Sequence, residues 1–330
     1  MILQPAILAL LVSSFLVSLM LLYAGWYGVL ILKNWDLASG SDLQLNLEKR
    51  TYLISVVLGY ALVFQIFSLF LYIFTADSLH TQFVGAMCAA GSLNVNHYGY
   101  PTLLLKIANC LLSGVWLIIN FADNRGYDYP LIKAKYSLLM ILAPLVVLEA
   151  LLQFGYFKGL HADVITSCCG SLFSAGKRSV GADLAGLPAI PMEWIFFGVM
   201  AATLISGVVF CFKEWGGYFF SAASLSTFII SAASLVSFIC LYIYELPTHH
   251  CPFCILQKEY GYIGYALYAT LLGGGITGLG VGALMPFKKI ASLVQVVPLI
   301  QRRLTWLSML FYLLFTILVA SKMLFTSFRL

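Results

Sequence analysis

The sequence predicts an all-α, polytopic membrane protein with about eight transmembrane helices. Apolar residues make up 62% of the 330 residues and charged residues only 9%, whereas soluble proteins carry roughly 25% charged residues. Long apolar runs separated by polar segments fill most of the chain. Because so few charges cannot cover a water-exposed surface, the composition excludes a large soluble domain. We expect a single integral membrane domain over residues 1–330.

Each apolar run of about 20 residues can cross a bilayer as a helix that satisfies its own backbone. The predicted spans are 6–32, 53–75, 102–121, 137–156, 193–212, 218–245, 260–285 and 305–325. The first run lacks a basic leader and is too long for a signal peptide, so we interpret it as a retained span. Segment 286–303 mixes apolar residues with lysines and arginines, which indicates either an interfacial helix or a basic loop.

Basic residues in the loops predict the orientation, because cytoplasmic loops are rich in lysine and arginine. The loops after spans one, three, five and seven carry Lys33, Lys49, Arg50, Arg125, Lys133, Lys135, Lys213, Lys288, Lys289, Arg302 and Arg303. The opposite side carries Lys158, Lys177, Arg178, Lys258, Lys322 and Arg329. Both termini are therefore expected to be extracytoplasmic, in a pattern that suits a bacterial inner membrane. The net charge of +5 is then explained by the lipid bilayer and not by a nucleic-acid partner.

A short internal repeat indicates two halves. Residues 71–73 and 241–243 both read Leu-Tyr-Ile, and a histidine follows seven residues after each isoleucine. A 4+4 duplication with halves 1–156 and 193–330, joined by the extracytoplasmic loop 157–192, is one interpretation of this short repeat.

Residues that carry chemistry gather in the loops placed outside. These loops contain five of the eight cysteines and all five histidines: Cys88, Cys168, Cys169, Cys251, Cys254, His80, His97, His161, His249 and His250. Cys110, Cys211 and Cys240 fall in predicted spans, where cysteine is a common small buried side chain. The one-sided distribution predicts a thiol and imidazole site on the outer face.

The sharpest motif is Cys251-Pro-Phe-Cys254, at the predicted start of the seventh helix. A helix N-terminus stabilises a thiolate. The two-residue spacing lets both sulfurs join in a disulfide or hold one metal ion. Lys258, one turn further on, would favour a thiolate or meet an anionic ligand.

The run from Cys251 to Lys258 resembles the Cys-x-x-Cys segment of DsbB-type disulfide-generating membrane proteins. The vitamin K epoxide reductase family also places such a pair at a helix end. In those families the pair takes part in thiol–disulfide exchange coupled to a quinone. The resemblance therefore implies exchange at Cys251 and Cys254, with Lys258 near the quinone head group. The chain departs from them in its eight spans and in having lysine where DsbB-type proteins have arginine.

The other cysteines in the outer loops leave several interpretations open. Cys168 and Cys169 are adjacent, and they would be a second redox pair, two soft metal ligands or part of a static disulfide. Cys88 would then be the odd thiol, which is often reactive or a ligand in such a compartment. A simple buried cysteine is the alternative.

Two charges fall inside predicted spans. Lys106 and Glu149 lie at similar depths in the third and fourth spans, and intramembrane charges usually mark function. They would line a proton path or a quinone pocket, or form a structural ion pair. Gly274, Gly278 and Gly282 recur every four residues in the seventh span, which predicts close helix packing.

Three functions remain open from the sequence. The first is a thiol–disulfide oxidoreductase that passes electrons between an extracytoplasmic thiol protein and membrane quinone. The second is binding or transport of a soft metal, copper or zinc, by the outer cysteines with His80, His97, His161, His249 and His250. The third is a membrane subunit of a larger complex, with disulfides that only brace its loops.

Overall fold

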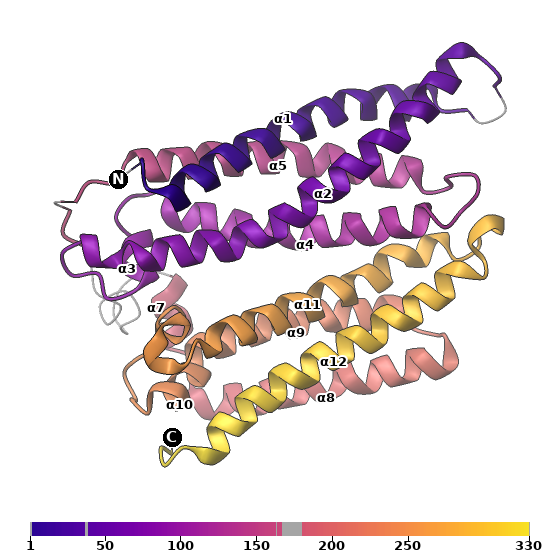
Figure 1. The fold of residues 1–330 in the computed structure, drawn as a ribbon. Coiled ribbons are helices and arrows are strands. Elements are labelled where there is room, and N and C mark those ends of the chain that lie inside the picture. The colour runs from indigo at the N-terminus through magenta and orange to yellow at the C-terminus, as the bar shows by residue number, and fades with distance from the viewer. Residues whose placement is uncertain (1, 37–38, 163, 167–179, 330) are drawn as a thin grey trace. The chain divides into compact units, whose positions relative to one another are not determined.

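The computed structural model describes residues 2–36, 39–162, 164–166 and 180–329 of a chain built from helices (Figure 1). Eight of the described helices are long and apolar enough to cross a membrane. They are α1 (Pro5–Asn34), α2 (Asp42–Ser78), α4 (Gly99–Asp123), α5 (Ile132–Lys158), α8 (Ala189–Lys213), α9 (Gly217–Ser234) continuing through a π-helical turn (Leu235–Ile239) into α10 (Cys240–Tyr244), α11 (Ile263–Leu284) and α12 (Val296–Phe325). The predicted all-α membrane bundle with eight spans is confirmed.

Short elements connect the long helices. They are the 3₁₀ turns η1 (His80–Gln82), η3 (Cys254–Leu256), η4 (Lys258–Tyr260), η5 (Met285–Phe287) and η6 (Ala291–Leu293), and the short helices α3 (Ala89–Leu93) and α7 (Val180–Ala185). Strand-like pairing among the described residues is limited to an isolated bridge between Val84 and Ile165.

Segment 286–303 differs from both interpretations of its sequence. It contains η6 and the first two turns of α12, which begins at Val296 and not at 305. Lysine and arginine are good helix formers, and Pro298 in the first turn removes an N–H group that has no helical partner there. The last span therefore starts inside the basic segment.

The chain forms two compact units. Unit 1 comprises residues 1–75, 96–160 and 283–301, and unit 2 comprises residues 76–95, 161–282 and 302–330. Unit 1 therefore holds most of the N-terminal long helices together with the first turns of α12, and unit 2 holds most of the C-terminal ones together with segment 76–95. The proposed 4+4 duplication stays a prediction.

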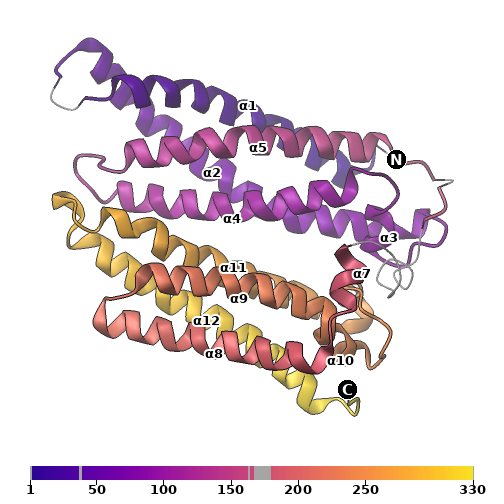
Figure 2. The ribbon, with the colours of Figure 1, turned by 180° about the vertical axis from the view of Figure 1, so that it is seen from behind.

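Unit 1 contains the antiparallel pair α4 and α5, with α1 packed beside α5 (Figures 1 and 2). The turn between α4 and α5 is closed by Asp123. Its Oδ1 atom accepts the backbone N–H of Leu131 at 2.8 Å, and its Oδ2 atom lies 2.6 Å from Lys135 Nζ. Trp116 donates its indole N–H to the carbonyl of Lys135 at 3.0 Å. The buried charges of this turn are thus paired, as a low-dielectric interior requires.

Unit 2 uses the glycine face of α11 as a packing surface. A Cβ atom added at Gly278 would lie 1.9 Å from Ser224 Oγ on α9, and one added at Gly274 would lie 2.8 Å from the Tyr312 ring on α12. The Tyr312 hydroxyl donates to the carbonyl of Ser224 at 2.8 Å. The predicted small-residue face is confirmed, because these contacts require the absence of a side chain.

Replacing Gly278 by alanine is expected to destabilise the protein by roughly 1–3 kcal/mol, the usual cost of overpacking. The added methyl group would overlap both Oγ and Cβ of Ser224. Gly198→Ala is the matched control, because nothing lies within 4 Å of a Cβ at Gly198. Thermal unfolding in detergent should show a lower midpoint for Gly278→Ala only. Equal midpoints for the two variants would contradict the packing described.

Candidate functional site: a buried cluster of three cysteines

Three cysteines from distant parts of the sequence meet in unit 2. The sulfur atoms of Cys88, Cys251 and Cys254 all lie within 4.8 Å of one another, and the Sγ atoms of Cys88 and Cys251 are 3.6 Å apart. The three residues are 0%, 1% and 6% exposed. A disulfide bond measures about 2.05 Å, so the 3.6 Å separation is a contact between two thiols and not a disulfide. The sequence named all three cysteines but did not predict that Cys88 joins the Cys-x-x-Cys pair.

Cys88 lies in a tight segment that precedes the short helix α3. Gly85 adopts φ +88°, a conformation that favours glycine, and a Cβ there would lie 2.6 Å from the carbonyl oxygen of Thr166. Thr166 donates its N–H to the carbonyl of Val84 at 3.0 Å and its hydroxyl to the carbonyl of Gly91 at 2.9 Å. The segment around Cys88 is therefore fastened to the loop that follows α5.

The backbone of the Cys-x-x-Cys segment is held by side chains of α10 and α11. Tyr244 donates its hydroxyl to the carbonyl of Cys251 at 2.5 Å, and Tyr268 donates to the carbonyl of Pro252. The thiol of Cys240 lies 3.4 Å from the same Cys251 carbonyl. These bonds satisfy carbonyl groups that would otherwise be buried without partners. The sequence did not single out Tyr244 or Cys240 as residues of this site.

A π-helical turn positions this backbone. Residues Leu235–Ile239 form the turn just before Cys240, and π-helical turns in α-helices are rare and occur often at functional sites. The carbonyl of Val236 in this turn lies 2.8 Å from Nδ1 of His250. No local pattern in the sequence signals this turn.

Two polar side chains, Asp77 and Gln257, hold Cys88 against the Cys-x-x-Cys segment. Gln257 donates its side-chain amide to the carbonyl of Met87 at 2.9 Å and lies 3.4 Å from Oδ1 of Asp77. The same Asp77 oxygen accepts the backbone N–H of Ala89 at 3.0 Å. Hydrogen bonds thus hold the residues on both sides of Cys88. We call the Asp77 and Gln257 side chains the bracket.

Gln257→Leu is expected to slow disulfide formation between Cys88 and Cys251 roughly tenfold. It removes both hydrogen bonds of the amide, each worth about 0.5–1.5 kcal/mol, and the segments are then less well aligned. The rate would be measured with diamide in a Cys254→Ser background, by mass-tagging the remaining thiols. Gln82→Leu, an exposed glutamine in the same unit, is the control. Equal rates in the two variants would show that the bracket does not align Cys88 with Cys251.

The chain matches no family model, no curated protein and no solved structure. The resemblance to DsbB-type and vitamin K epoxide reductase proteins therefore rests on residues 251–258 alone. What this site does has to be inferred from its own geometry.

The Cys-x-x-Cys motif does not begin the seventh long helix, contrary to the expectation from the sequence. Cys254 starts the 3₁₀ turn η3, and α11 begins only at Ile263. Gly261 and Tyr262 have φ values of +64° and +57°, and this left-handed backbone interrupts the helix. The two cysteines therefore precede α11 in the chain and do not lie in its first turn.

The other residues considered at this site lie around it or elsewhere. Lys258 is exposed in η4, and Cys168 and Cys169 lie outside the described residues. The converging group of described side chains contains no histidine. His80, His249 and His250 lie in unit 2 and are half-buried, while His97 in unit 1 and His161 in unit 2 are exposed.

Aromatic rings cover part of the site. The ring of Tyr244 packs edge-on against His249 at 4.4 Å and against Tyr260 at 4.7 Å between centroids. Partial burial, and next the nearby Cys254, raise the pKa of the Tyr260 phenol. Tyr260 therefore stays protonated and uncharged beside the sulfur cluster.

The two intramembrane charges form an ion pair in unit 1. Lys106 Nζ lies 2.6 Å from Glu149 Oε1, and both side chains are 1% exposed. Gln65 and Asn109 each donate an amide N–H to Glu149 Oε2 at 2.6 Å. Lys106 also donates to the hydroxyl of Ser68 at 3.1 Å. The expected pairing is confirmed, and a role beside a quinone or a proton path stays a prediction.

Proposed function

We propose that this membrane protein is a thiol–disulfide oxidoreductase in which Cys88, Cys251 and Cys254 form one redox centre. It would pass electrons between an extracytoplasmic thiol protein and membrane quinone. The observation that carries the proposal is the 3.6 Å approach of Cys88 to Cys251, which itself belongs to a Cys-x-x-Cys pair. A thiolate attacks a disulfide along a short sulfur–sulfur path, and this cluster offers such a path.

When Cys251 and Cys254 join, their two thiols release two protons and two electrons, and a quinone that takes up both becomes a quinol. Attack of Cys88 on Cys251 breaks the bond between Cys251 and Cys254 and forms one between Cys88 and Cys251, leaving Cys254 as the thiol. Cys251 is the common member of both disulfides. The steps run in either direction, according to the potentials of the two partners.

The burial of the three cysteines favours thiol–disulfide exchange over a site that holds permanent charge. A pair of thiols and a disulfide are both uncharged, so neither end state places charge in a low-dielectric site. The buried lysines of the described chain, Lys106 and Lys135, are paired with carboxylates in unit 1. No buried lysine of the described residues therefore compensates permanent thiolates at the cluster.

Exchange with a partner protein would use Cys168 and Cys169. They follow Thr166 by two and three residues along the chain, and Thr166 is bonded to the segment that carries Cys88. This anchoring supports a route from the outer loop to the buried cluster. The quinone head group would lie near Lys258, as the resemblance implies. The site would face the periplasm or exterior of a bacterial inner membrane.

Soft-metal binding is the second candidate, favoured by the convergence of three sulfurs within 4.8 Å. Two thiolates on one zinc ion lie about 3.8 Å apart when each zinc–sulfur bond is about 2.3 Å, and the observed 3.6 Å is similar. Three thiolates would leave a net negative charge on a site with Cu(I) or Zn(II). This uncompensated charge is the reason why we place metal binding second.

The experiment is a thiol count on the full chain in native membranes. Membranes are first reduced, and mass-tagging then counts reactive thiols before and after addition of a soluble quinone analogue. A parallel sample receives a copper and zinc chelator without reductant. Cys110→Ser serves as a control, because Cys110 lies in unit 1 and takes no part in the cluster.

The three outcomes separate the three functions. Loss of two cluster thiols on addition of quinone, restored by reductant, supports the redox centre. Thiols that become reactive with chelator alone support the metal site and reject the redox proposal. A disulfide that reforms in air but does not respond to quinone would indicate that the cysteines only brace the loops of a subunit in a larger complex.

A further inference from the structure

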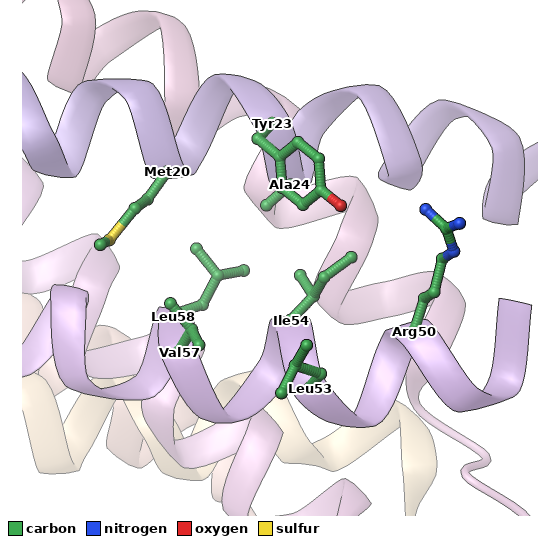
Figure 3. Close-up of a pocket in the computed structure, with 8 residues that line it drawn as sticks. All are labelled: Met20, Tyr23, Ala24, Arg50, Leu53, Ile54, Val57 and Leu58. Carbon is green, nitrogen blue, oxygen red and sulfur yellow. The ribbon is translucent and has the colours of Figure 1, made fainter.

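A groove in unit 1 runs between α1 and α2 and has one charged end. It encloses about 110 Å³ and is lined by Met20 and Tyr23 of α1 and by Arg50, Leu53 and Val57 of α2, among others. Figure 3 shows Arg50 at one end and Met20 at the other, with the Tyr23 ring between them and its phenol oxygen on the side of Arg50. The groove is therefore apolar along its length and polar at one mouth.

Arg50 is held in place at this mouth. Its side chain donates to the hydroxyl of Tyr27, and the guanidinium carbon lies 5.2 Å from the centre of the Tyr27 ring. Tyr27 in turn packs against Tyr23 at 5.0 Å between ring centroids. A guanidinium group has five donors in a fixed fork, which matches phosphate oxygens. A positioned, exposed arginine is suited to bind an anion at this point.

The position of Arg50 in the sequence places the charged mouth at the membrane boundary. Polar residues precede Arg50, and the predicted apolar span begins at residue 53. From Arg50 to Leu58 the helix rises roughly 12 Å, and the residues of α2 that line the groove beyond Arg50 are aliphatic. The lining residues of the described groove carry no acidic group. An anionic head at the boundary with an apolar tail below it fits this arrangement.

We propose that the groove binds an anionic phospholipid, with its phosphate on Arg50 and one acyl chain between α1 and α2. Lipid tails in the bilayer are as apolar as the groove wall, so apolar contact alone gives little preference. The selectivity must then come from the head group. The predicted orientation places Arg50 in the cytoplasmic leaflet, where anionic lipids are common.

The test is a comparison of bound lipids on the purified full chain. Protein is equilibrated in mixed micelles of phosphatidylglycerol and phosphatidylcholine with matched acyl chains, and the lipids that stay bound are quantified. Wild type should retain phosphatidylglycerol about fivefold over phosphatidylcholine. Arg50→Gln should lose this preference, and Arg50→Lys should keep part of it. Lys49→Gln, which removes a neighbouring exposed charge, should keep nearly all of it.

A second variant tests the groove itself. Val57→Trp fills the apolar wall and leaves Arg50 in place, so it should reduce retention of phosphatidylglycerol while the protein stays monodisperse. The proposal is overturned if Arg50→Gln keeps the preference, or if Lys49→Gln loses it equally. It is also overturned if Val57→Trp retains lipid like wild type, since binding would then be at the surface. A groove occupied by a second copy of the chain would leave the wild type without a preference for phosphatidylglycerol, which also overturns the proposal.

Discussion

Cys251→Ser is expected to abolish disulfide exchange within the cluster. Cys251 is the partner of Cys254 in the Cys-x-x-Cys pair and lies 3.6 Å from Cys88, so both disulfides of the proposed cycle need it. Loss of the cysteine shared by both disulfides should slow quinone-driven thiol oxidation on the order of 100-fold or more. The measurement is the rate at which cluster thiols disappear in reduced membranes after addition of a quinone analogue.

Matched variants separate this role from a general effect of losing a cysteine. Cys254→Ser should still form the bond between Cys88 and Cys251 and should accumulate it, because the resolving thiol is gone. Cys110→Ser should oxidise like wild type. If Cys251→Ser oxidises at the wild-type rate, the redox centre does not include the cluster.

Glu149→Leu is expected to destabilise the protein by about 3–5 kcal/mol, the usual cost of leaving one buried charge without its partner. Lys106 is 1% exposed and lies 2.6 Å from the Glu149 carboxylate. The amides of Gln65 and Asn109 would also lose their acceptor. Thermal unfolding in detergent, together with the fraction of monodisperse protein, measures the loss.

The double variant Lys106→Met with Glu149→Leu is the control for this prediction. It removes both charges and keeps apolar volume, and replacing a whole buried pair in this way is often neutral. We therefore expect it to recover most of the stability lost in Glu149→Leu. A stable single variant, or a double variant as unstable as the single one, would show that the pair is not the cause. Quinone-driven oxidation in the double variant would report separately on a functional role of the two charges.

Local features of the sequence were sufficient to predict much of the fold. The eight spans follow from the length of each apolar run, because a bilayer fixes the length of a crossing helix. The glycine face of α11 follows from its four-residue spacing. The pair Lys106 and Glu149 follows from matching depths in neighbouring spans, because a charge in a membrane needs a partner.

The features that escaped prediction depend on tertiary contacts or on single backbone angles. Cys88 and Cys251 are 163 residues apart in the chain, and no spacing rule joins them. The early start of α12 at Val296 and the interruption before α11 at Gly261 follow local backbone preferences that hydropathy does not report. The π-helical turn that positions Cys240 and the carbonyl of Val236 has no sequence signature.

Disulfide mapping tests the redox centre most directly. Wild-type protein in native membranes would be reduced, oxidised with a quinone analogue, alkylated and digested, and the linked peptides identified by mass spectrometry. We expect the new bonds to join Cys251 to Cys254, with a minor fraction that joins Cys251 to Cys88. Folded protein in which quinone forms no bond among these three cysteines would contradict the proposed redox centre.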